Sequence, residues 1–165
     1  MGDKFYLIFP LCTGGELYEA VSKRGHFTEF DAACIMRDLI GALNALHENN
    51  VLHLDIKPEN ILFTKDGPDG KIQLTDFGLS RINDRDVSTT STEMPSAESL
   101  RATLKRFVEI GISNPTLKGT VGYMSPEVIL AGVYTRAADM WAAGVVAYIL
   151  LSGLPPFHSR SHRYY

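Results

Sequence analysis

Two short apolar runs on either side of a strong turn signal most constrain how this chain can fold. Ile61–Phe63 and Ile72–Leu74 favour strands, because they are apolar, partly β-branched and bounded by turn residues. The segment between them, Asp66-Gly67-Pro68-Asp69-Gly70, is typical of a turn. We therefore predict a β-hairpin. It would bring the segment that ends at Asn60 close to the segment that begins at Asp76.

Most of the remaining pattern is helical, so the expected fold is α+β and mainly helical. Thr28, with Asp31 three residues later, resembles a capping box at the start of a helix. Apolar residues then recur at helical spacing as far as about His47, which indicates a face packed in the core. They are Ala32, Ile35, Met36, Leu39, Leu43 and Leu46. A shorter helix is predicted from about Glu16 to Lys23, ended by Gly25.

Three further elements are predicted from local patterns. Phe5–Phe9 is a continuous apolar run, which is typical of a strand buried on both faces. Ser125-Pro126-Glu127 favours the start of a short helix, since proline is well tolerated in the first turn, and Gly132 would close it. Arg136–Ser152 is nearly all apolar beyond Asp139, which predicts a helix buried on all sides.

A polar segment separates the hairpin from the last helices. Residues 83–99 contain many hydroxyl and charged side chains and few apolar ones, so burial cannot offset the loss of chain entropy. We expect this segment to be disordered. Leu100, Leu104, Phe107 and Val108 follow helical spacing, which predicts a short amphipathic helix after it.

The composition fits one globular domain and excludes some partners. Sixteen basic and nineteen acidic residues give a net charge of −3, which argues against nucleic acid or an anionic membrane as a partner. The apolar stretch Met140–Leu151 is too short to span a bilayer. Cys12 and Cys34 are too few for a disulfide framework. Free thiols and the lack of a secretory signal favour the cytoplasm, with the nucleus as an alternative.

Chemically distinctive residues flank the predicted hairpin. Residues 53–60 read His-Leu-Asp-Ile-Lys-Pro-Glu-Asn, and residues 76–78 read Asp-Phe-Gly. Asp55 can accept a proton from a hydroxyl group. Asn60 and Asp76 offer the hard oxygen ligands that magnesium prefers, and Lys57 can reach a phosphate as a point charge. This combination indicates phosphoryl transfer.

The order and spacing of these motifs resemble the eukaryotic protein kinase domain. Gly119-Thr120 and Ser125-Pro126-Glu127 match the downstream part of the same pattern. The resemblance implies ATP and Mg²⁺ as cofactors and a protein hydroxyl as acceptor. It identifies residues 1–165 as a partial kinase domain that runs from the hinge through the C-lobe to the central helix. Within it, residues 83–118 would be a long, partly disordered insertion in the activation segment.

The resemblance also implies individual roles. Asp55, Lys57 and Thr120 would be catalytic, with the Thr120 hydroxyl linking the other two, and Asn60 and Asp76 would bind the metal. Asp139 would hold the backbone of the catalytic loop. The residues implied to contact the nucleotide are Phe9 as gatekeeper, Pro10 and Cys12 at the adenine edge, Glu16 at the ribose and Leu62 beneath the adenine.

Two features favour a particular kind of kinase. Lys57 and Thr120 imply serine or threonine in the protein substrate. Leu54 and the sequence Leu-Ser-Gly-Leu-Pro-Pro-Phe at residues 151–157 resemble the calcium/calmodulin-dependent group. A calmodulin-type regulator that binds outside this chain is left open. Leu54 replaces the arginine with which many kinases read a phosphate, which argues against switching by a single activation-segment phosphate.

The chain also departs from the kinase pattern. No Gly-x-Gly-x-x-Gly precedes residue 16, and no Val-Ala-Ile-Lys segment is present. We interpret the chain as a lower-lobe fragment in which the N-lobe is absent, and we expect it to have negligible kinase activity alone. One alternative is a non-catalytic kinase-like interaction module, although the intact set Asp55, Lys57, Asn60 and Asp76 argues against it. Another is a small-molecule kinase, against which the pattern at residues 119–127 argues.

Overall fold

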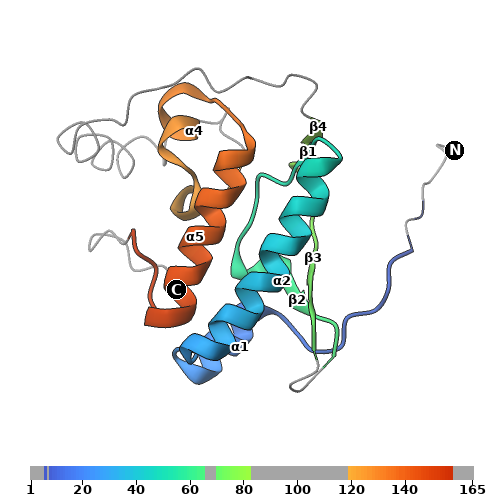
Figure 1. Ribbon diagram of the computed structural model, residues 1–165, viewed down its shortest axis with the longest axis vertical. Coiled ribbons are helices and arrows are strands. Elements are labelled where there is room, and N and C mark those ends of the chain that lie inside the picture. The colour runs from blue at the N-terminus through green and yellow to red at the C-terminus, as the bar shows by residue number, and fades with distance from the viewer. Residues whose placement is uncertain (1–5, 7, 66–69, 83–118, 158–165) are drawn as a thin grey trace, which may run out of the picture.

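The structure is a computed structural model that describes residues 6, 8–65, 70–82 and 119–157. Four helices and two small antiparallel sheets make up the described fold (Figure 1). The helices are α1 (Leu17–Arg24), α2 (Glu29–Glu48), α4 (Pro126–Ala131) and α5 (Arg136–Ser152). The strands are β1 (Val51–Leu52), β2 (Ile61–Phe63), β3 (Ile72–Leu74) and β4 (Arg81–Ile82), and short 3-10 turns lie at η1 (Pro58–Asn60) and η2 (Val121–Tyr123). The predicted mainly helical α+β fold is confirmed.

The predicted hairpin forms with the predicted bounds. β2 and β3 pair antiparallel, with Ile61 opposite Leu74 and Phe63 opposite Ile72. On its other side, β2 is flanked by the chain ahead of α1. There the Gly14 N–H donates to the Phe63 carbonyl at 3.0 Å, and Glu16 forms a β-bridge with Leu62. The strand is therefore held on both edges.

The helix boundaries follow the capping signals in the sequence. The Thr28 hydroxyl accepts a hydrogen bond from the Asp31 N–H at 3.1 Å, which satisfies one of the free donors at the start of α2. Gly25 ends α1 with a φ of +79°, and Gly132 ends α4 in the left-handed region. Glycine adopts both conformations without the steric penalty that a Cβ would add.

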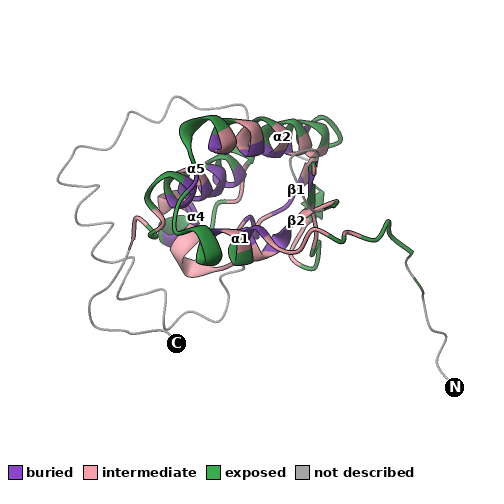
Figure 2. Cartoon of the chain, turned by 90° about the horizontal axis from the view of Figure 1, so that it is seen from below, coloured by how far each residue is buried: buried purple, intermediate pink, exposed green. Residues whose placement is uncertain are grey.

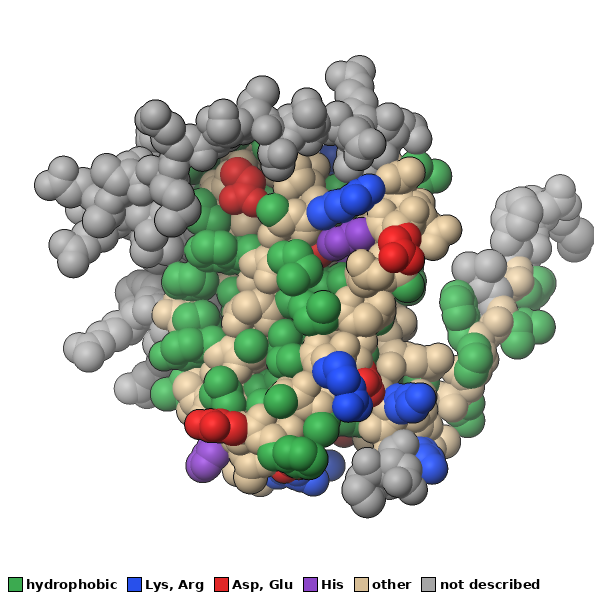
Figure 3. All heavy atoms as spheres, in the orientation of Figure 1, with side chains coloured by type: hydrophobic (Ala, Val, Ile, Leu, Met, Phe, Trp, Pro, Cys, Tyr) green, Lys and Arg blue, Asp and Glu red, His purple; other side chains and the backbone are tan. Residues whose placement is uncertain are grey.

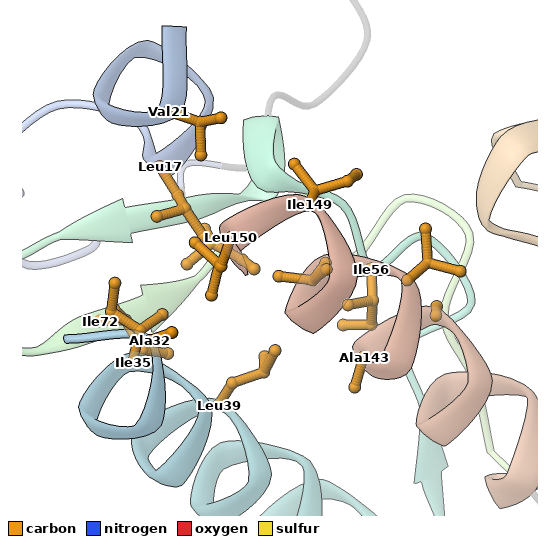
Figure 4. Packing of buried hydrophobic residues seen from close by; sticks show 14 of the residues in the cluster. Leu17, Val21, Ala32, Ile35, Leu39, Ile56, Ile72, Ala143, Ile149 and Leu150 are labelled. Atoms are coloured by element: carbon orange, nitrogen blue, oxygen red, sulfur yellow. The ribbon is translucent and has the colours of Figure 1, made fainter. Parts of the chain in front are cut away.

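The core lies where α1, α2 and α5 meet the hairpin. Figure 2 shows the buried residues on the inward sides of these helices. In Figure 4, Leu17 of α1 and Leu150 of α5 point toward one another, and Ile56 lies against Ala143. Four of the six residues predicted to form the inner face of α2 are buried, and the other two pack against the core.

The prediction of a buried strand at Phe5–Phe9 is wrong for the described residues. Ile8 and Phe9 belong to no strand, and their exposed fractions are 96% and 71%. An apolar run forms a buried strand only where other strands and a covering layer adjoin it, and none of the described elements does so there. Phe5 and Leu7 lie outside the described residues.

Helix α5 is buried on one side only. Met140, Tyr148 and Leu151 are exposed, and hydrophobic side chains crowd the face over α5 in Figure 3. The described elements that pack on α5 cover only its inner side, so the prediction that this helix is buried on all sides is wrong for the described residues.

The predicted disorder at residues 83–99 and the predicted helix at residues 100–108 lie outside the described residues. None of the helices described has the length and hydropathy of a membrane span.

We predict that Leu43→Ala destabilises the protein by about 2–5 kcal/mol, because Leu43 is fully buried in the core and the truncation leaves a cavity. Chemical denaturation would measure the free energy of unfolding. Ile40→Ala, on the exposed side of the same helix, should stay within about 1 kcal/mol of the parent. Equal losses in both variants would contradict this location of the core.

Candidate active site

The hairpin brings together the two motifs that flank it. Asn60 directly precedes β2, and Thr75 directly follows β3. The Thr75 N–H donates to the Asn60 carbonyl at 3.0 Å, which continues the ladder by one pair beyond the strands. Asp76, the next residue, therefore follows the point at which the two segments are joined, as the sequence predicted.

The loop that carries Asp55 is anchored from α5. The Asp139 carboxylate accepts the His53 N–H at 3.0 Å and the Leu54 N–H at 2.8 Å, and Asp139 itself is 1% exposed. The predicted contact of Asp139 with the loop backbone is confirmed. Leu54 has a φ of +68°, a conformation that is costly for a residue other than glycine. The hydrogen bond to Asp139 helps to hold it there.

Asp55 is the centre of a polar network. One carboxylate oxygen accepts the Thr120 hydroxyl at 2.8 Å and the Thr120 N–H at 3.2 Å. The other oxygen lies 2.9 Å from Lys57 Nζ and accepts the Asn60 side-chain amide at 3.0 Å. Lys57 Nζ also donates to the Thr120 hydroxyl at 3.0 Å. The structure thus contains the predicted link from Asp55 through Thr120 to Lys57, and it adds Asn60 as a fourth member.

This network controls the charge of Asp55. Burial of the carboxyl raises its pKa. Hydrogen bonds from Lys57 and Thr120, together with the positive charge of Lys57, lower the pKa by more, so the pKa of Asp55 lies below its ordinary value. Asp55 is therefore ionised at neutral pH and presents an oriented acceptor.

Asn60 and Asp76 are arranged to offer oxygen atoms. The amide nitrogen of Asn60 donates hydrogen bonds to the Asp55 carbonyl and carboxylate, at 2.8 and 3.0 Å. The amide oxygen of Asn60 is therefore the atom that could bind a metal. Asp76 is exposed, and one of its oxygens accepts the Gly78 N–H at 3.1 Å. An amide oxygen and a carboxylate suit Mg²⁺, which commonly takes one or two protein ligands and completes its shell with phosphates and water. In the described part of the chain, no group of three or more His, Cys, Asp and Glu could hold a metal alone.

The residues predicted at the nucleotide edge are only partly brought together. Glu16 and Leu62 lie opposite one another in a β-bridge, and the Cys12 thiol donates to the Gln73 side chain at 2.9 Å. Phe9 and Pro10 are exposed, on the segment that leads away from the helices in Figure 1. The structure therefore places Glu16, Leu62 and Cys12 along the sheet, but it does not bring Phe9 and Pro10 to it.

Two histidines lie at the site although the sequence predicted no role for either: His53, the first residue of the motif that contains Asp55, and His47. The His53 ring nitrogen Nε2 lies 3.1 Å from the Thr75 carbonyl, and its Nδ1 accepts the Asp55 N–H at 3.3 Å. Because Nδ1 is the acceptor, the ring is neutral with its proton on Nε2. His47, at the end of α2, lies with its Nε2 2.9 Å from an Asp139 oxygen. In the sequence it is only the last residue of an apolar stripe, so no local signal distinguishes it.

Comparison with known proteins agrees with this geometry. The protein kinase domain family matches residues 1–165, so the chain belongs to this family.

Its similar relatives include calcium/calmodulin-dependent kinases. Calcium/calmodulin-dependent protein kinase type 1 from Caenorhabditis elegans is 38% identical over 156 residues, which cover 94% of this chain and 37% of that protein. Type 1B from Homo sapiens is 37% identical over 94% of this chain and 38% of its own length. The calcium and calcium/calmodulin-dependent serine/threonine-protein kinase from Oryza sativa subsp. japonica is 36% identical over 160 residues, which cover 96% of this chain and 26% of that protein. This chain therefore spans less than two fifths of these relatives.

We predict that protonation of His53 makes the protein less stable in mild acid. Burial lowers the pKa of His53 below the ordinary 6.5, so the unfolded chain takes up a proton at a higher pH than the folded one. This contribution to stability is complete above pH 6.5 and is lost as the pH falls below it, at up to about 1.4 kcal/mol per pH unit. Denaturation at pH 7.5 and 5.5 would measure it. His53→Gln should flatten the pH dependence and exposed His26→Gln should not; equal slopes in all three proteins would refute the assignment.

We also predict that Gly119→Ala distorts the site. Gly119 has a φ of +118°, and a Cβ there would lie 2.8 Å from the Leu54 carbonyl oxygen. The cost should be about 1–3 kcal/mol in the free energy of unfolding, because the new side chain adds backbone strain to a close contact. Gly122→Ala, three residues away in open space, is the matched control and should change stability by about 0.5 kcal/mol or less. Similar losses of stability in the two variants would contradict the close approach of Gly119 to the Leu54 carbonyl oxygen.

Proposed function

We propose that this chain supplies the catalytic segment of a serine/threonine protein kinase, which transfers the γ-phosphoryl group of ATP to a protein hydroxyl. The observation that carries the proposal is the Asp55 carboxylate, bound by Thr120, Lys57 and Asn60. Such a carboxylate can hold an acceptor hydroxyl in line for attack. Family membership supports the same reaction.

In this proposal Asp55 orients the hydroxyl and takes up its proton late in the reaction. A lowered pKa makes a carboxylate a weak base, so early removal of the proton would be unfavourable. A loose transition state places little negative charge on the hydroxyl oxygen until the phosphoryl group has largely transferred. Orientation is then the larger contribution. Lys57, which is held beside Asp55, would offer positive charge to the transferring group.

Asn60 and Asp76 are proposed to hold Mg²⁺ together with the nucleotide phosphates. When bound, the metal neutralises phosphate charge and fixes the orientation of the triphosphate. The two residues come from neighbouring strands at the same, open end of the hairpin: Asn60 precedes β2, and Asp76 follows Thr75, whose N–H donates to the Asn60 carbonyl. Glu16 is proposed to contact the ribose, and Leu62 to lie beneath the adenine. The backbone around Pro10 and Cys12 is proposed to bond the adenine edge, with Phe9 as gatekeeper.

Serine or threonine is the proposed acceptor. Lys57 and the Thr120 hydroxyl are joined at 3.0 Å, and this pair led to the same assignment from the sequence. A relative from Oryza sativa subsp. japonica carries serine/threonine-protein kinase in its name. The names of the relatives cited also contain calcium/calmodulin-dependent, which supports control of the whole protein by a calmodulin-type regulator.

These 165 residues are proposed to act as a C-lobe that needs further chain for full activity. They contain neither a Gly-x-Gly-x-x-Gly loop nor a Val-Ala-Ile-Lys segment, which in protein kinases cover and bind the ATP phosphates. For the nucleotide and metal, these residues would therefore supply contacts from the lower side of the site only, beside the proposed roles of Asp55 and Lys57.

We predict weak but specific binding of Mn²⁺–ATP, with Mn²⁺ as a paramagnetic probe in place of Mg²⁺. Amide signals of Ile61 and Phe77, next to the proposed ligands, should broaden in NMR spectra. Asp76→Asn should weaken this binding about tenfold or more, because even the loss of a residue that only hydrogen-bonds to a metal ligand lowers metal affinity by about tenfold. Phosphate transfer to a serine peptide should remain near background.

Glu29→Gln is the matched control, because it removes the same charge from an exposed position at the start of α2. Equal broadening in the parent and Asp76→Asn would overturn the metal assignment, and no broadening at all would favour a non-catalytic interaction module. Robust phosphate transfer that is lost in Asp55→Asn would show that these residues suffice for activity without further chain.

A further inference from the structure

His47 occupies an unusual place for a polar residue at the end of a core helix. Its exposed fraction is 8%, and its ring nitrogen Nε2 lies 2.9 Å from Asp139, which is 92 residues later in the chain. The catalytic network around Asp55 does not include it. A buried imidazole aimed at a buried carboxylate needs an explanation beyond packing, because burial of polar groups is costly unless they are paired.

The Asp139 carboxylate accepts three N–H groups. One oxygen accepts the Leu54 N–H, and the other accepts both the His53 N–H and the His47 ring. An ionised carboxylate has no proton to donate, so His47 must carry its proton on Nε2. The two backbone donors come from the catalytic loop, whereas the third comes from the side chain of a different element.

This third donor fixes the direction of the carboxylate. The terminal torsion of an aspartate has a broad, shallow energy profile, so two donors from one loop can move together with the carboxylate they bind. His47 belongs to α2, a separate element of 20 residues that packs in the core. It thereby fixes the oxygen that His53 shares. Leu54 needs such a fixed acceptor, because its φ of +68° is unfavourable for leucine.

We propose that His47 is a positioning residue for the candidate active site. Through Asp139 it holds the backbone of His53 and Leu54, and so sets the place of Asp55, which follows them directly. Its contribution to catalysis rests on the proposed kinase function, whereas its contribution to loop geometry does not. The contact ties the end of α2 and the start of α5 to one point in the loop.

Amide hydrogen exchange of the 165-residue chain, followed residue by residue in NMR spectra, tests the proposal. In His47→Leu, which removes the donor, the amides of His53 and Leu54 should exchange about tenfold faster or more, as expected for a lost hydrogen bond to a charged group. Exchange of the Leu43 and Leu150 amides in the core helices should change by much less. His47→Gln keeps an N–H donor and should restore protection of the loop to within about threefold of the parent.

His26→Leu is the control, because His26 is exposed in the loop between α1 and α2. Uniform acceleration of loop and core amides in His47→Leu would reveal a role in stability alone and would overturn the proposal, as would unchanged exchange of the loop amides. An unprotonated Nε2 in the imidazole ¹⁵N spectrum of His47 would overturn it as well. None of these measurements uses nucleotide, so they can fail or succeed independently of the Mn²⁺–ATP experiment.

Discussion

The carboxylate of Asp139, in the first turn of α5, is almost completely shielded from water and accepts hydrogen bonds from the two backbone N–H groups just ahead of Asp55. Desolvating a charged group is expensive, and the cost is offset only when its oxygens are well occupied, as the three N–H donors to Asp139 provide. The loop that carries Asp55, α2 and α5 therefore depend on one another. Removal of any partner would leave a buried charge underpaired, so the stability of the fold and the geometry of the site depend on the same few atoms.

Local signals predicted much of this arrangement, because they depend on neighbours close in sequence. The hairpin follows from a turn sequence between two apolar runs, and its pairing then determines that Asn60 and Asp76 come together. Helix ends follow from Thr28 and Gly25, whose side-chain and backbone preferences act within one turn. Motif spacing supplied the link among Asp55, Lys57 and Thr120, although that prediction came from the family resemblance rather than from physical reasoning alone.

The features that were not predicted depend on residues that are far apart in the sequence. His47 resembles the last residue of an apolar stripe until α5 places Asp139 beside it. β1 and β4 are two residues each, too short to show a periodic pattern, and they pair across about thirty residues. The apolar runs at residues 5–9 and in α5 led to wrong predictions for the described residues. Hydrophobicity indicates that a segment can be buried, but whether it is buried depends on what lies against it.

Strand β2 has a consequence for how this site can change during evolution. Within it, only Ile61 separates Asn60, proposed to bind the metal, from Leu62, which forms the bridge with Glu16 at the proposed nucleotide edge. With a rise of about 3.3 Å per residue and both edges hydrogen-bonded, the strand acts as a fixed spacer. One inserted or deleted residue would shift both contacts at once and turn alternate side chains to the opposite face. Length changes are therefore better tolerated in the segment that joins β2 to β3 than within the strand itself.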